Sequence, residues 1–340
     1  MTKLVFATQR LDPDHPTLGA AAAMVRALAA RMDEVVVLAL SGTAGSLPAN
    51  VRLRSFAAPT QLLRGARFES VLAAELVRGR PDALLAHMSP VYAVLAAPVL
   101  RPLRVPVLLW FTQQKGGVQL GRAAHVVDAI LSVDTRSVPL ASSKVRAIGH
   151  GIDTSMFTCA AVNAPGGPLR LLSLGRYADV KGHDVVVRAL TSLPDAELIV
   201  RGEEATPNDA SVRARLADLV RELGLSKRVR LLDAVSRSKV PDLLAETDVL
   251  VNATHGMSAD KVVLEALAAC VPVVAASPVF DTLLSAELRF ADGDPDDLAA
   301  RVRTAAGLPA DERRRLRSLV EARHSVEHWA DGLLAAVAGQ

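Results

Sequence analysis

The sequence predicts an α/β protein made of two doubly wound, Rossmann-like domains. Short apolar segments typical of buried parallel strands alternate with helical segments of about ten residues, and this alternation runs twice along the chain. A chain of 340 residues is long enough for two ordinary domains. Between the two halves, the stretch Ala160–Pro168 (AAVNAPGGP) is rich in proline and glycine, which indicates a linker. We therefore predict an N-terminal domain over residues 1–160 and a C-terminal domain over residues 168–322.

Apolar runs and an alanine-rich helix define the first half. The predicted strands are Leu4–Thr8, Val35–Leu40, Val51–Phe56, Ala83–His87, Val105–Phe111, Ala129–Val133 and Val145–Ile148. The predicted helices are Ala20–Met32, Phe68–Arg78 and Gly121–Val127. The longest uncharged run, Ala83–Leu100, contains a histidine and two prolines, so we interpret it as a strand, a loop and a helix rather than a membrane span.

The second half repeats the alternation after the linker. The predicted strands are Leu169–Leu174, Glu197–Arg201, Val229–Leu232, Val249–Asn252 and Val273–Ala276. The predicted helices are His183–Leu190, Ser211–Leu223, Val240–Glu246 and Ser258–Ala269. Strands joined by helices form right-handed parallel units, and ligands of such sheets bind at the carboxyl ends of the strands. Two such domains in tandem predict an interdomain cleft where those ends face each other.

Composition excludes several classes of protein. Residues 1–165 carry 17 Lys or Arg against 10 Asp or Glu, but no basic run is interleaved with aromatic residues, so we expect no nucleic-acid partner. The basic half is compatible with an acidic acceptor or with at most peripheral membrane contact, but scattered solvated arginines are the simpler interpretation. Cys159 and Cys270 are too few for a disulfide framework and lack the spacing of metal ligands. Together with a start, MTKLVFATQRLDPDHP, that lacks the apolar stretch of a signal peptide, this predicts a cytoplasmic protein with unpaired thiols.

The segment Leu174–Asp184 (LGRYADVKGHD) is the richest in candidate chemistry. Arg176 and Lys181 follow the carboxyl end of a predicted strand and precede a helix. Two cations beside a helix N-terminus suit a phosphate or diphosphate. The alternative is a surface turn with solvated cations.

A second candidate segment is His255–Cys270 (HGMSADKVVLEALAAC). Ser258 is a candidate N-cap of the helix, and Lys261 and Glu265 share one helix face because they are four residues apart. A carboxylate on that face can accept hydrogen bonds from a ribose diol. The alternative is an ordinary surface ion pair, although the apolar residues between the two indicate a largely buried helix.

Read together, these segments resemble the donor half of retaining glycosyltransferase family 4, the nucleotide-sugar-dependent group 1 enzymes. The resemblance rests on GRYADVKGHDVVVRAL, IVRG, RVRLLDAVSRSKVPDLLAETDVLVNAT and DKVVLEALAACVPVVAAS, in this order. In the first half TQRLDPDHPTLG, HMSPVY, LLWFTQQK and IGHGIDTSMF are similar to the family as well. The tail HSVEHWADGLLAAVAG resembles the closing helix, over about residues 325–340, that crosses back onto the first domain. The resemblance implies the GT-B architecture, with acceptor-side and donor-side domains.

The resemblance also implies an activity and roles for residues. It implies transfer of a sugar from a nucleoside diphosphate sugar, with retention of configuration and without a metal or other cofactor. We expect a UDP-sugar slightly before a GDP-sugar, and a small-molecule, saccharide or natural-product acceptor, while the oligomeric state stays open. By position, Arg176 and Lys181 would neutralise the leaving diphosphate, and Glu265 would hold the ribose. Gly19 and Gly202 would bring backbone close to the donor.

Three positions depart from the family pattern. Met257 replaces the first glutamate of the usual Glu-x7-Glu pair, so Asp260 and Lys261 are our candidates for sugar recognition. Gln113 stands where the family often has a catalytic histidine; it can donate a hydrogen bond but cannot act as a base. His87 is then the nearest candidate imidazole. Cys270 replaces the glycine that usually ends the Glu265 helix, at a cost of about 1 kcal/mol if its φ is positive.

Two histidines are weaker candidates. His150, in the segment GHGID, and His255 could each line the cleft or could serve only packing. An active glycosyltransferase is our main hypothesis. The alternative is a catalytically impaired, glycosyltransferase-like binding or partner subunit, because of Met257 and Gln113. A nicotinamide-dependent enzyme is excluded by the lack of G-x-G-x-x-G after the first strand.

Overall fold

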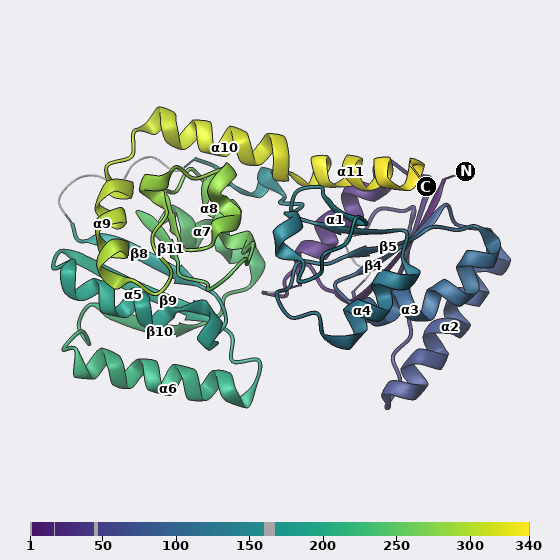
Figure 1. The fold of residues 1–340 in the computed structure, drawn as a ribbon, viewed down its shortest axis with the longest axis horizontal. Coiled ribbons are helices and arrows are strands. Elements are labelled where there is room, and N and C mark those ends of the chain that lie inside the picture. Colours follow the sequence, from purple (N-terminus) through teal and green to yellow (C-terminus); the bar gives the residue numbers. More distant parts are fainter. Residues whose placement is uncertain (1, 17, 44–46, 160–166, 340) are drawn as a thin grey trace. The chain divides into compact units, whose positions relative to one another are not determined.

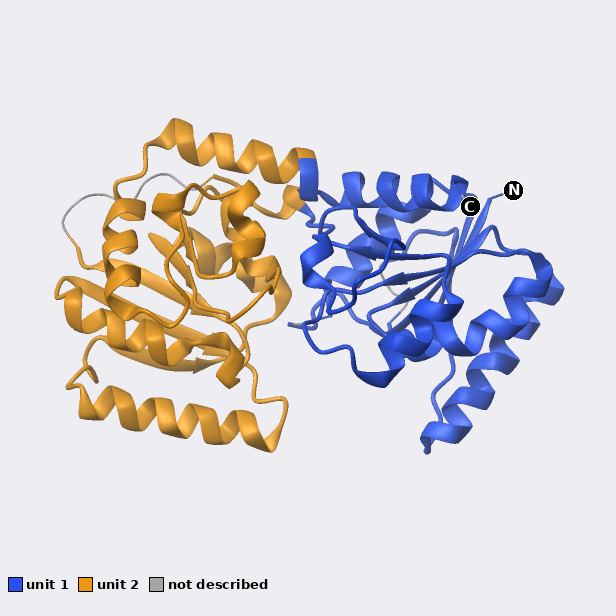
Figure 2. Ribbon diagram, in the orientation of Figure 1, with its two compact units in different colours: residues 1–153, 323–340 blue, residues 154–322 orange. Residues whose placement is uncertain are grey.

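The computed structural model describes residues 2–16, 18–43, 47–159 and 167–339. The chain divides into two compact α/β units, residues 1–153 with 323–340 and residues 154–322 (Figure 2). Both are built around a parallel sheet, as the sequence predicts. Most of the predicted linker, residues 160–166, lies outside the described residues.

The first unit, within the described residues, is built on a seven-stranded parallel sheet in the order β3-β2-β1-β4-β5-β6-β7. Its strands are β1 (Lys3–Leu11), β2 (Glu34–Gly42), β3 (Val51–Ser55), β4 (Ala83–His87), β5 (Val107–Trp110), β6 (Ala129–Ser132) and β7 (Val145–Ala147). The strand order reverses between β1 and β4, which is where an open parallel sheet can admit a ligand.

Helices cover both faces of this sheet (Figure 1). They are α1 (Ala20–Ala29), α2 (Gln61–Arg78), α3 (Pro90–Leu100), α4 (Gly117–Val126) and α11 (Val326–Ala338). Helix α1 packs against α11, and α3 packs against α2 and α4. Nearly every residue of α1 is buried, because its alanines allow close approach to the sheet and to α11. Helix α2 begins at Thr60, whose hydroxyl caps the Leu63 N–H, and buries Phe68 and Leu72 in the core.

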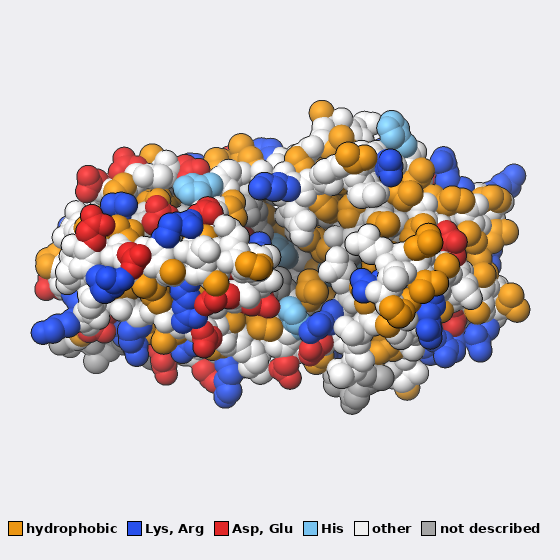
Figure 3. Space-filling model, turned by 90° about the horizontal axis from the view of Figure 1, so that it is seen from below, with side chains coloured by type: hydrophobic (Ala, Val, Ile, Leu, Met, Phe, Trp, Pro, Cys, Tyr) orange, Lys and Arg blue, Asp and Glu red, His pale blue; other side chains and the backbone are white. Residues whose placement is uncertain are grey.

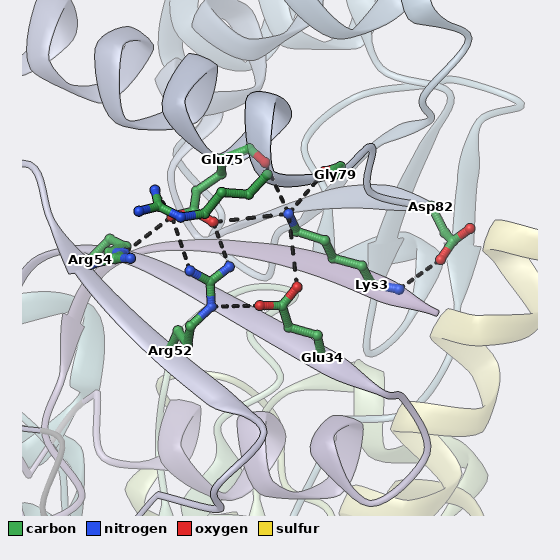
Figure 4. Close-up of polar contacts among 8 residues, drawn as sticks. Lys3, Glu34, Arg52, Arg54, Glu75, Gly79 and Asp82 are labelled. Atoms are coloured by element: carbon green, nitrogen blue, oxygen red, sulfur yellow. Dashed lines mark hydrogen bonds and ion pairs between the residues drawn. The ribbon is translucent and has the colours of Figure 1, made fainter. Parts of the chain in front are cut away.

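The amino ends of the first strands carry a network of charges, shown in Figure 4. The Glu75 carboxylate, almost fully buried on α2, accepts from Arg52 at 2.7 Å and from Arg54 at 3.1 Å. Lys3 donates to the backbone oxygens of Glu75 and Gly79, and its main-chain N–H donates to Asp82. The network ties α2 to β1 and β3 at the edge opposite the carboxyl ends of the strands.

The second unit, in its described part, has a five-stranded parallel sheet in the order β10-β9-β8-β11-β12. Its strands are β8 (Leu169–Leu174), β9 (Ala196–Gly202), β10 (Val229–Asp233), β11 (Val249–Asn252) and β12 (Val273–Ala275). Its helices are α5 (His183–Ala189), α6 (Pro207–Glu222), α7 (Val240–Ala245), α8 (Lys261–Ala268), α9 (Pro295–Ala306) and α10 (Ala310–His324). The order reverses between β8 and β11.

The closing helix α11 belongs to the first unit although it follows the second in sequence. The main-chain N–H groups of Gly151 and Ile152 both donate to the His324 carbonyl, just before α11 begins. Gly149 and Gly151 have positive φ, and a Cβ on Gly149 would lie 2.1 Å from the Arg323 carbonyl oxygen. Only glycine fits these two positions, so the GHG segment is built to receive the returning chain.

The expectation of unpaired thiols was wrong, because Cys159 and Cys270 form a disulfide bond. The two residues are 111 positions apart in sequence, so their proximity depends on the fold and is invisible in their spacing, whereas their Cα atoms are 4.8 Å apart. Cys270 has a φ of +59°, which is the left-handed conformation expected where the family has glycine. The bond joins the end of the α8 segment to the chain just before the predicted linker.

Charged side chains are distributed differently over the surfaces of the two units. On the face shown in Figure 3, the part formed by the second unit bears interspersed acidic and basic groups, whereas the part formed by the first unit bears apolar and basic groups and few acidic ones. This agrees with the excess of Lys and Arg in residues 1–165. Within the described residues, no helix combines the length and the apolar character needed to span a bilayer.

Candidate functional site

The strongest candidate site lies at the switch point of the second sheet. Strands β8 and β11 are neighbours there, and the loops after them bring Lys181 and Asp260 together. Lys181 Nζ contacts both carboxylate oxygens of Asp260 at 2.7 Å. Asn252, the last residue of β11, donates to the same carboxylate at 2.9 Å, and Thr254 donates at 2.6 Å. Two predicted site residues are therefore held in one hydrogen-bonded cluster.

Helix α8, which carries Lys261 and Glu265, begins later than the sequence predicts. We expected Ser258 to be the N-cap, but α8 begins at Lys261 and its N-cap is Asp260. The Ser258 hydroxyl donates to Asp260 instead of capping the helix. Burial tends to raise the pKa of the Asp260 carboxyl, but the charge of Lys181 and the hydrogen bonds from Lys181, Thr254 and Asn252 hold that pKa well below its usual range. The carboxylate is therefore ionised, and it holds the Lys181 ammonium in place through two contacts of 2.7 Å.

Glu265 lies one turn further along α8 and is paired with Arg237, a residue that the sequence analysis did not single out. Arg237 Nη1 donates to Glu265 Oε1 at 2.5 Å, and both side chains are almost fully buried. The second terminal nitrogen, Arg237 Nη2, has no hydrogen-bond partner among the described residues although it is buried. The only sequence signal for this role is the position of Arg237 in a loop that follows β10.

Lys261 completes the charged cluster. Burial lowers the pKa of its ammonium to about 8, an effect that the charge of Glu265 opposes and that of Arg237 reinforces. Lys181, Arg237 and Lys261 supply three cations, against the carboxylates of Asp260 and Glu265. A cluster with one excess positive charge beside a helix N-terminus suits an anionic ligand.

Arg176 is held apart from this cluster. Its Nη1 is 3.4 Å from Asp209 Oδ2, and its side chain is 41% exposed, so it is accessible to a ligand. Asp209 lies in the first turn of α6 and also accepts from the Ala205 N–H and the Thr206 hydroxyl. The structure thus places Arg176 and Lys181 in the same loop but on different carboxylate partners.

Buried polar groups and glycines fix the shape of that loop. His183 Nδ1 is 2.9 Å from the Ser173 hydroxyl, and its Nε2 faces the carbonyl of Arg176 at 3.1 Å. Burial lowers the pKa of His183 to about 4, so the imidazole is neutral. A Cβ on Gly202 would lie 2.2 Å from the Gly175 carbonyl oxygen, so this glycine permits the loop after β8 to pass close to the end of β9.

His255 belongs to a different part of the unit. Its Nδ1 is 2.5 Å from Asp292 Oδ1, at the surface. It borders a cavity of about 570 Å³ whose other lining residues come mainly from α5 and α6, rather than from the Lys181–Asp260 cluster.

The four predicted residues of the first unit lie at or after the ends of four different strands, β1, β4, β5 and β7. Gly19 is the buried N-cap of α1. His87 is buried at the end of β4, with Nδ1 3.1 Å from the Thr8 hydroxyl and its ring stacked on Phe6. Gln113, just after β5, is exposed. His150 lies edge-on to Trp110 at a centroid distance of 6.3 Å and stands between the two glycines that receive the chain before α11, which favours a packing role.

In the described residues no three His, Cys, Asp or Glu side chains gather as a metal site would require.

Comparison with known proteins agrees with this location. Residues 168–307 match the family described as "Glycosyl transferases group 1". A "D-inositol 3-phosphate glycosyltransferase" of Mycolicibacterium paratuberculosis is 30% identical over 200 residues, which cover 56% of this chain and 38% of the relative. The chain therefore matches well under half of the length of this relative.

Solved structures match over nearly the whole chain. A sucrose-phosphate synthase from Thermosynechococcus elongatus superposes with a TM-score of 0.79 at 16% identity, covering 98% of this chain and 97% of the other. Anabaena Alr3699/HepE, solved in complex with UDP-glucose, also has a TM-score of 0.79 at 16% identity, with complete coverage of both chains. These likenesses confirm the predicted GT-B fold. Residues 168–307 of the second unit thus match a group 1 glycosyltransferase domain, within a chain that has the fold of the GT-B glycosyltransferases.

Proposed function

We propose that the protein is a retaining glycosyltransferase that moves a sugar from a nucleoside diphosphate sugar to a hydroxyl of an acceptor. The observation that carries the proposal is the cationic cluster at the switch point between β8 and β11, within a group 1 glycosyltransferase domain. A leaving diphosphate gains negative charge as the bond to the sugar breaks, and fixed cations nearby stabilise that charge.

The residues divide the work as follows. Lys181, positioned by Asp260, and the accessible Arg176 bind the diphosphate, while Lys261 adds a third cation at the start of α8. Glu265, oriented by Arg237, accepts hydrogen bonds from the ribose diol. Because Asp260 is engaged by several donors, it acts on the sugar only through Lys181, and Lys261 is the stronger candidate for direct contact with the donor.

We propose a UDP-sugar as the donor in preference to a GDP-sugar, and a reaction that needs no metal. Anabaena Alr3699/HepE, which shares the fold, is solved in complex with UDP-glucose, and this supports a uridine donor here. The cations named above supply the charge compensation that a metal ion provides elsewhere. Gln113 and His87 are the candidates for contacts at the reacting centre. We place the reaction in the cytoplasm, although the disulfide removes the cysteine-based reason for that location.

The experiment is to incubate the full chain with UDP-, GDP-, TDP- and ADP-sugars and acceptor mixtures, and to measure release of the nucleoside diphosphate. Release from one donor that depends on acceptor supports the proposal. If a nucleoside diphosphate binds but no sugar is transferred or hydrolysed from any donor, the chain is instead the catalytically impaired binding subunit. NMR of the product sugar distinguishes retention from inversion, and EDTA should leave the rate unchanged.

A further inference from the structure

A second candidate site lies in the first unit, at the carboxyl edge of its sheet. A cavity of about 460 Å³ opens between the ends of β1 and β2, the segment after β3 and the start of α2. That volume is within the usual range for small-molecule sites. The side chains that matter here are Gln9, Arg10, His15, Ser41 and Arg64, all of which line the cavity.

The lining is cationic. It includes two guanidinium groups and one imidazole, and no carboxylate is among the described lining residues. Neither Arg10 nor Arg64 lies within ion-pair distance of a carboxylate elsewhere in the described chain. Arg64 is nevertheless held in place, because its Nε donates to the Ala58 carbonyl at 2.8 Å. An anchored arginine without a carboxylate partner can bind an anion with little loss of side-chain entropy.

The charge network of β2, β3 and α2 provides the contrast. There Arg52 and Arg54 are neutralised by the buried carboxylate of Glu75, and Glu34 adds a second carboxylate to Arg52 (Figure 4). At the carboxyl edge of β1 and β2, where parallel sheets bind ligands, Arg10 and Arg64 have no such carboxylate partner in the part of the chain that the structure describes. The positive charge of the cavity is therefore available to a ligand.

His15 also lines the cavity, and its Nδ1 accepts from the Leu18 N–H at 3.2 Å, which holds the ring in place. Gln9 Nε2 donates to Ser89, which fixes the side chain beside Arg10. The guanidinium donors of Arg10 and Arg64 in a cavity with polar side chains match the oxygens of a phosphate monoester.

We propose that this cavity binds a phosphate group of the acceptor, so that the acceptor is a phosphorylated hydroxyl compound. The assignment to the acceptor rests on the proposed function, whereas the presence of an anion site in the first unit does not. The phosphate could belong to a soluble sugar phosphate or to a lipid headgroup, since both present the same group to Arg10 and Arg64.

The test is isothermal titration calorimetry of the full chain with glucose 6-phosphate, glucose and inorganic phosphate, in the presence of excess UDP to occupy the second unit. We expect glucose 6-phosphate and phosphate to bind, and glucose to bind far more weakly. Arg10→Ala and Arg64→Ala should each weaken glucose 6-phosphate binding by about tenfold or more, the usual loss for one charged hydrogen-bonding partner. Arg67→Ala, exposed one turn further along α2 and outside the cavity, is the matched control and should bind as the wild type does.

Vesicles distinguish the two sources of the phosphate. The protein is sedimented with phosphatidylcholine vesicles that contain one fifth phosphatidic acid, and with vesicles of pure phosphatidylcholine. If the protein sediments only with phosphatidic acid, and only when Arg10 and Arg64 are present, the phosphate belongs to a lipid headgroup. Binding of glucose 6-phosphate that depends on the same residues, without sedimentation, reports a soluble acceptor. The proposal is overturned if no phosphate compound or vesicle binds, or if binding is the same in Arg10→Ala, Arg64→Ala and wild type.

The proposed glycosyltransferase function and the proposed anion site can be tested independently of each other. UDP binding to Arg10→Ala and Arg64→Ala should equal that of the wild type, because the two arginines are in the first unit. Loss of sugar transfer from every donor, with phosphate binding to the cavity intact, would overturn the enzymatic proposal but not the anion site.

Discussion

Arg237 Nη1 donates to Glu265 Oε1 at 2.5 Å, and this ion pair lies in the interior of the second unit. The guanidinium comes from the turn that precedes α7, and the carboxylate comes from the middle of α8. A buried carboxylate is costly without a cation, so the pair fixes the position of Glu265 on the helix that also carries Lys261. The orientation of Glu265, the proposed ribose contact, thus depends on Arg237, which lies outside the segment His255–Cys270.

Replacing Arg237 by methionine should destabilise the second unit by about 3–5 kcal/mol, because Glu265 is then buried without its cation. Urea unfolding monitored by circular dichroism measures the loss. The double variant Arg237→Met with Glu265→Gln should recover much of the stability, since no uncompensated charge remains. An unfolding midpoint for Arg237→Met equal to that of the wild type would show that the pair is not buried in solution.

The affinity for UDP should fall as the pH rises through about 8. Burial lowers the pKa of Lys261 to about this value, so its ammonium loses its proton above it and no longer attracts the diphosphate. Calorimetric titration with UDP between pH 7 and pH 9.5 measures the change. Lys261→Arg, which stays charged throughout, should show a much flatter profile. An equally steep profile in this variant would assign the titration to another group.

The protein should lose stability as the pH falls below about 6.5, which is well above the pH range in which carboxylates become protonated. The pKa of His183 is lowered to about 4 by burial, so between this value and its unfolded pKa near 6.5 the unfolded state binds more protons. Its contribution to stability is fully present above the unfolded pKa and is lost as the pH falls through this window.

The expected loss from His183 between pH 7 and pH 5 is about 2 kcal/mol of unfolding free energy. His324 in the first unit, with a pKa also lowered to about 4 by burial, adds a similar dependence there. Thermal unfolding at a series of pH values measures both. His183→Gln should lower the stability at pH 7 but reduce the slope between pH 7 and pH 5. If the stability of His183→Gln has the same pH dependence between pH 7 and pH 5 as that of the wild type, His183 takes up its proton equally in the folded and the unfolded state, which contradicts the lowered pKa.

Gln113 and His87 should respond differently to replacement by alanine. Gln113 is exposed, so Gln113→Ala should leave the melting temperature unchanged and lower kcat by the equivalent of about 1–3 kcal/mol if its amide contacts the reacting groups. His87 is buried against Phe6 and Thr8, so His87→Ala should lower the melting temperature. Initial rates with saturating donor and thermal unfolding separate the two effects. Unchanged rates in both variants would place the reacting centre elsewhere.

Much of the fold could be predicted from the sequence because both sheets are parallel and buried. Strands β4, β8 and β11 have the predicted bounds, since continuous apolar runs mark strands that are covered on both faces. Helices α9 and α10 were outside the predicted set. In α10 only Leu316 and Val320 are buried, and a strongly charged helix offers little apolar periodicity to detect.

Only those site residues that belong to a local sequence motif could be predicted from the sequence. Lys181, Asp260, Lys261 and Glu265 come together as the strand-and-loop pattern indicates, and their roles stay proposals. Arg237 was missed because it reaches Glu265 across 28 positions of sequence, and the Cys159–Cys270 bond was missed because it joins two segments 111 positions apart. Contacts of this kind depend on tertiary structure and leave no local pattern.

The most direct test of the account is the affinity of UDP for the full chain and for Arg176→Ala and Lys181→Ala, measured by calorimetry. Lys239→Ala is the matched control, because Lys239 is exposed at the surface of the same unit and is paired with Asp242. We predict that UDP binds the wild type and the control equally, that uridine binds far more weakly, and that each of the other variants loses about a hundredfold in affinity, roughly 3 kcal/mol. Equal affinities for UDP and uridine, or wild-type affinity in Lys181→Ala, would contradict a diphosphate site at the β8–β11 switch point.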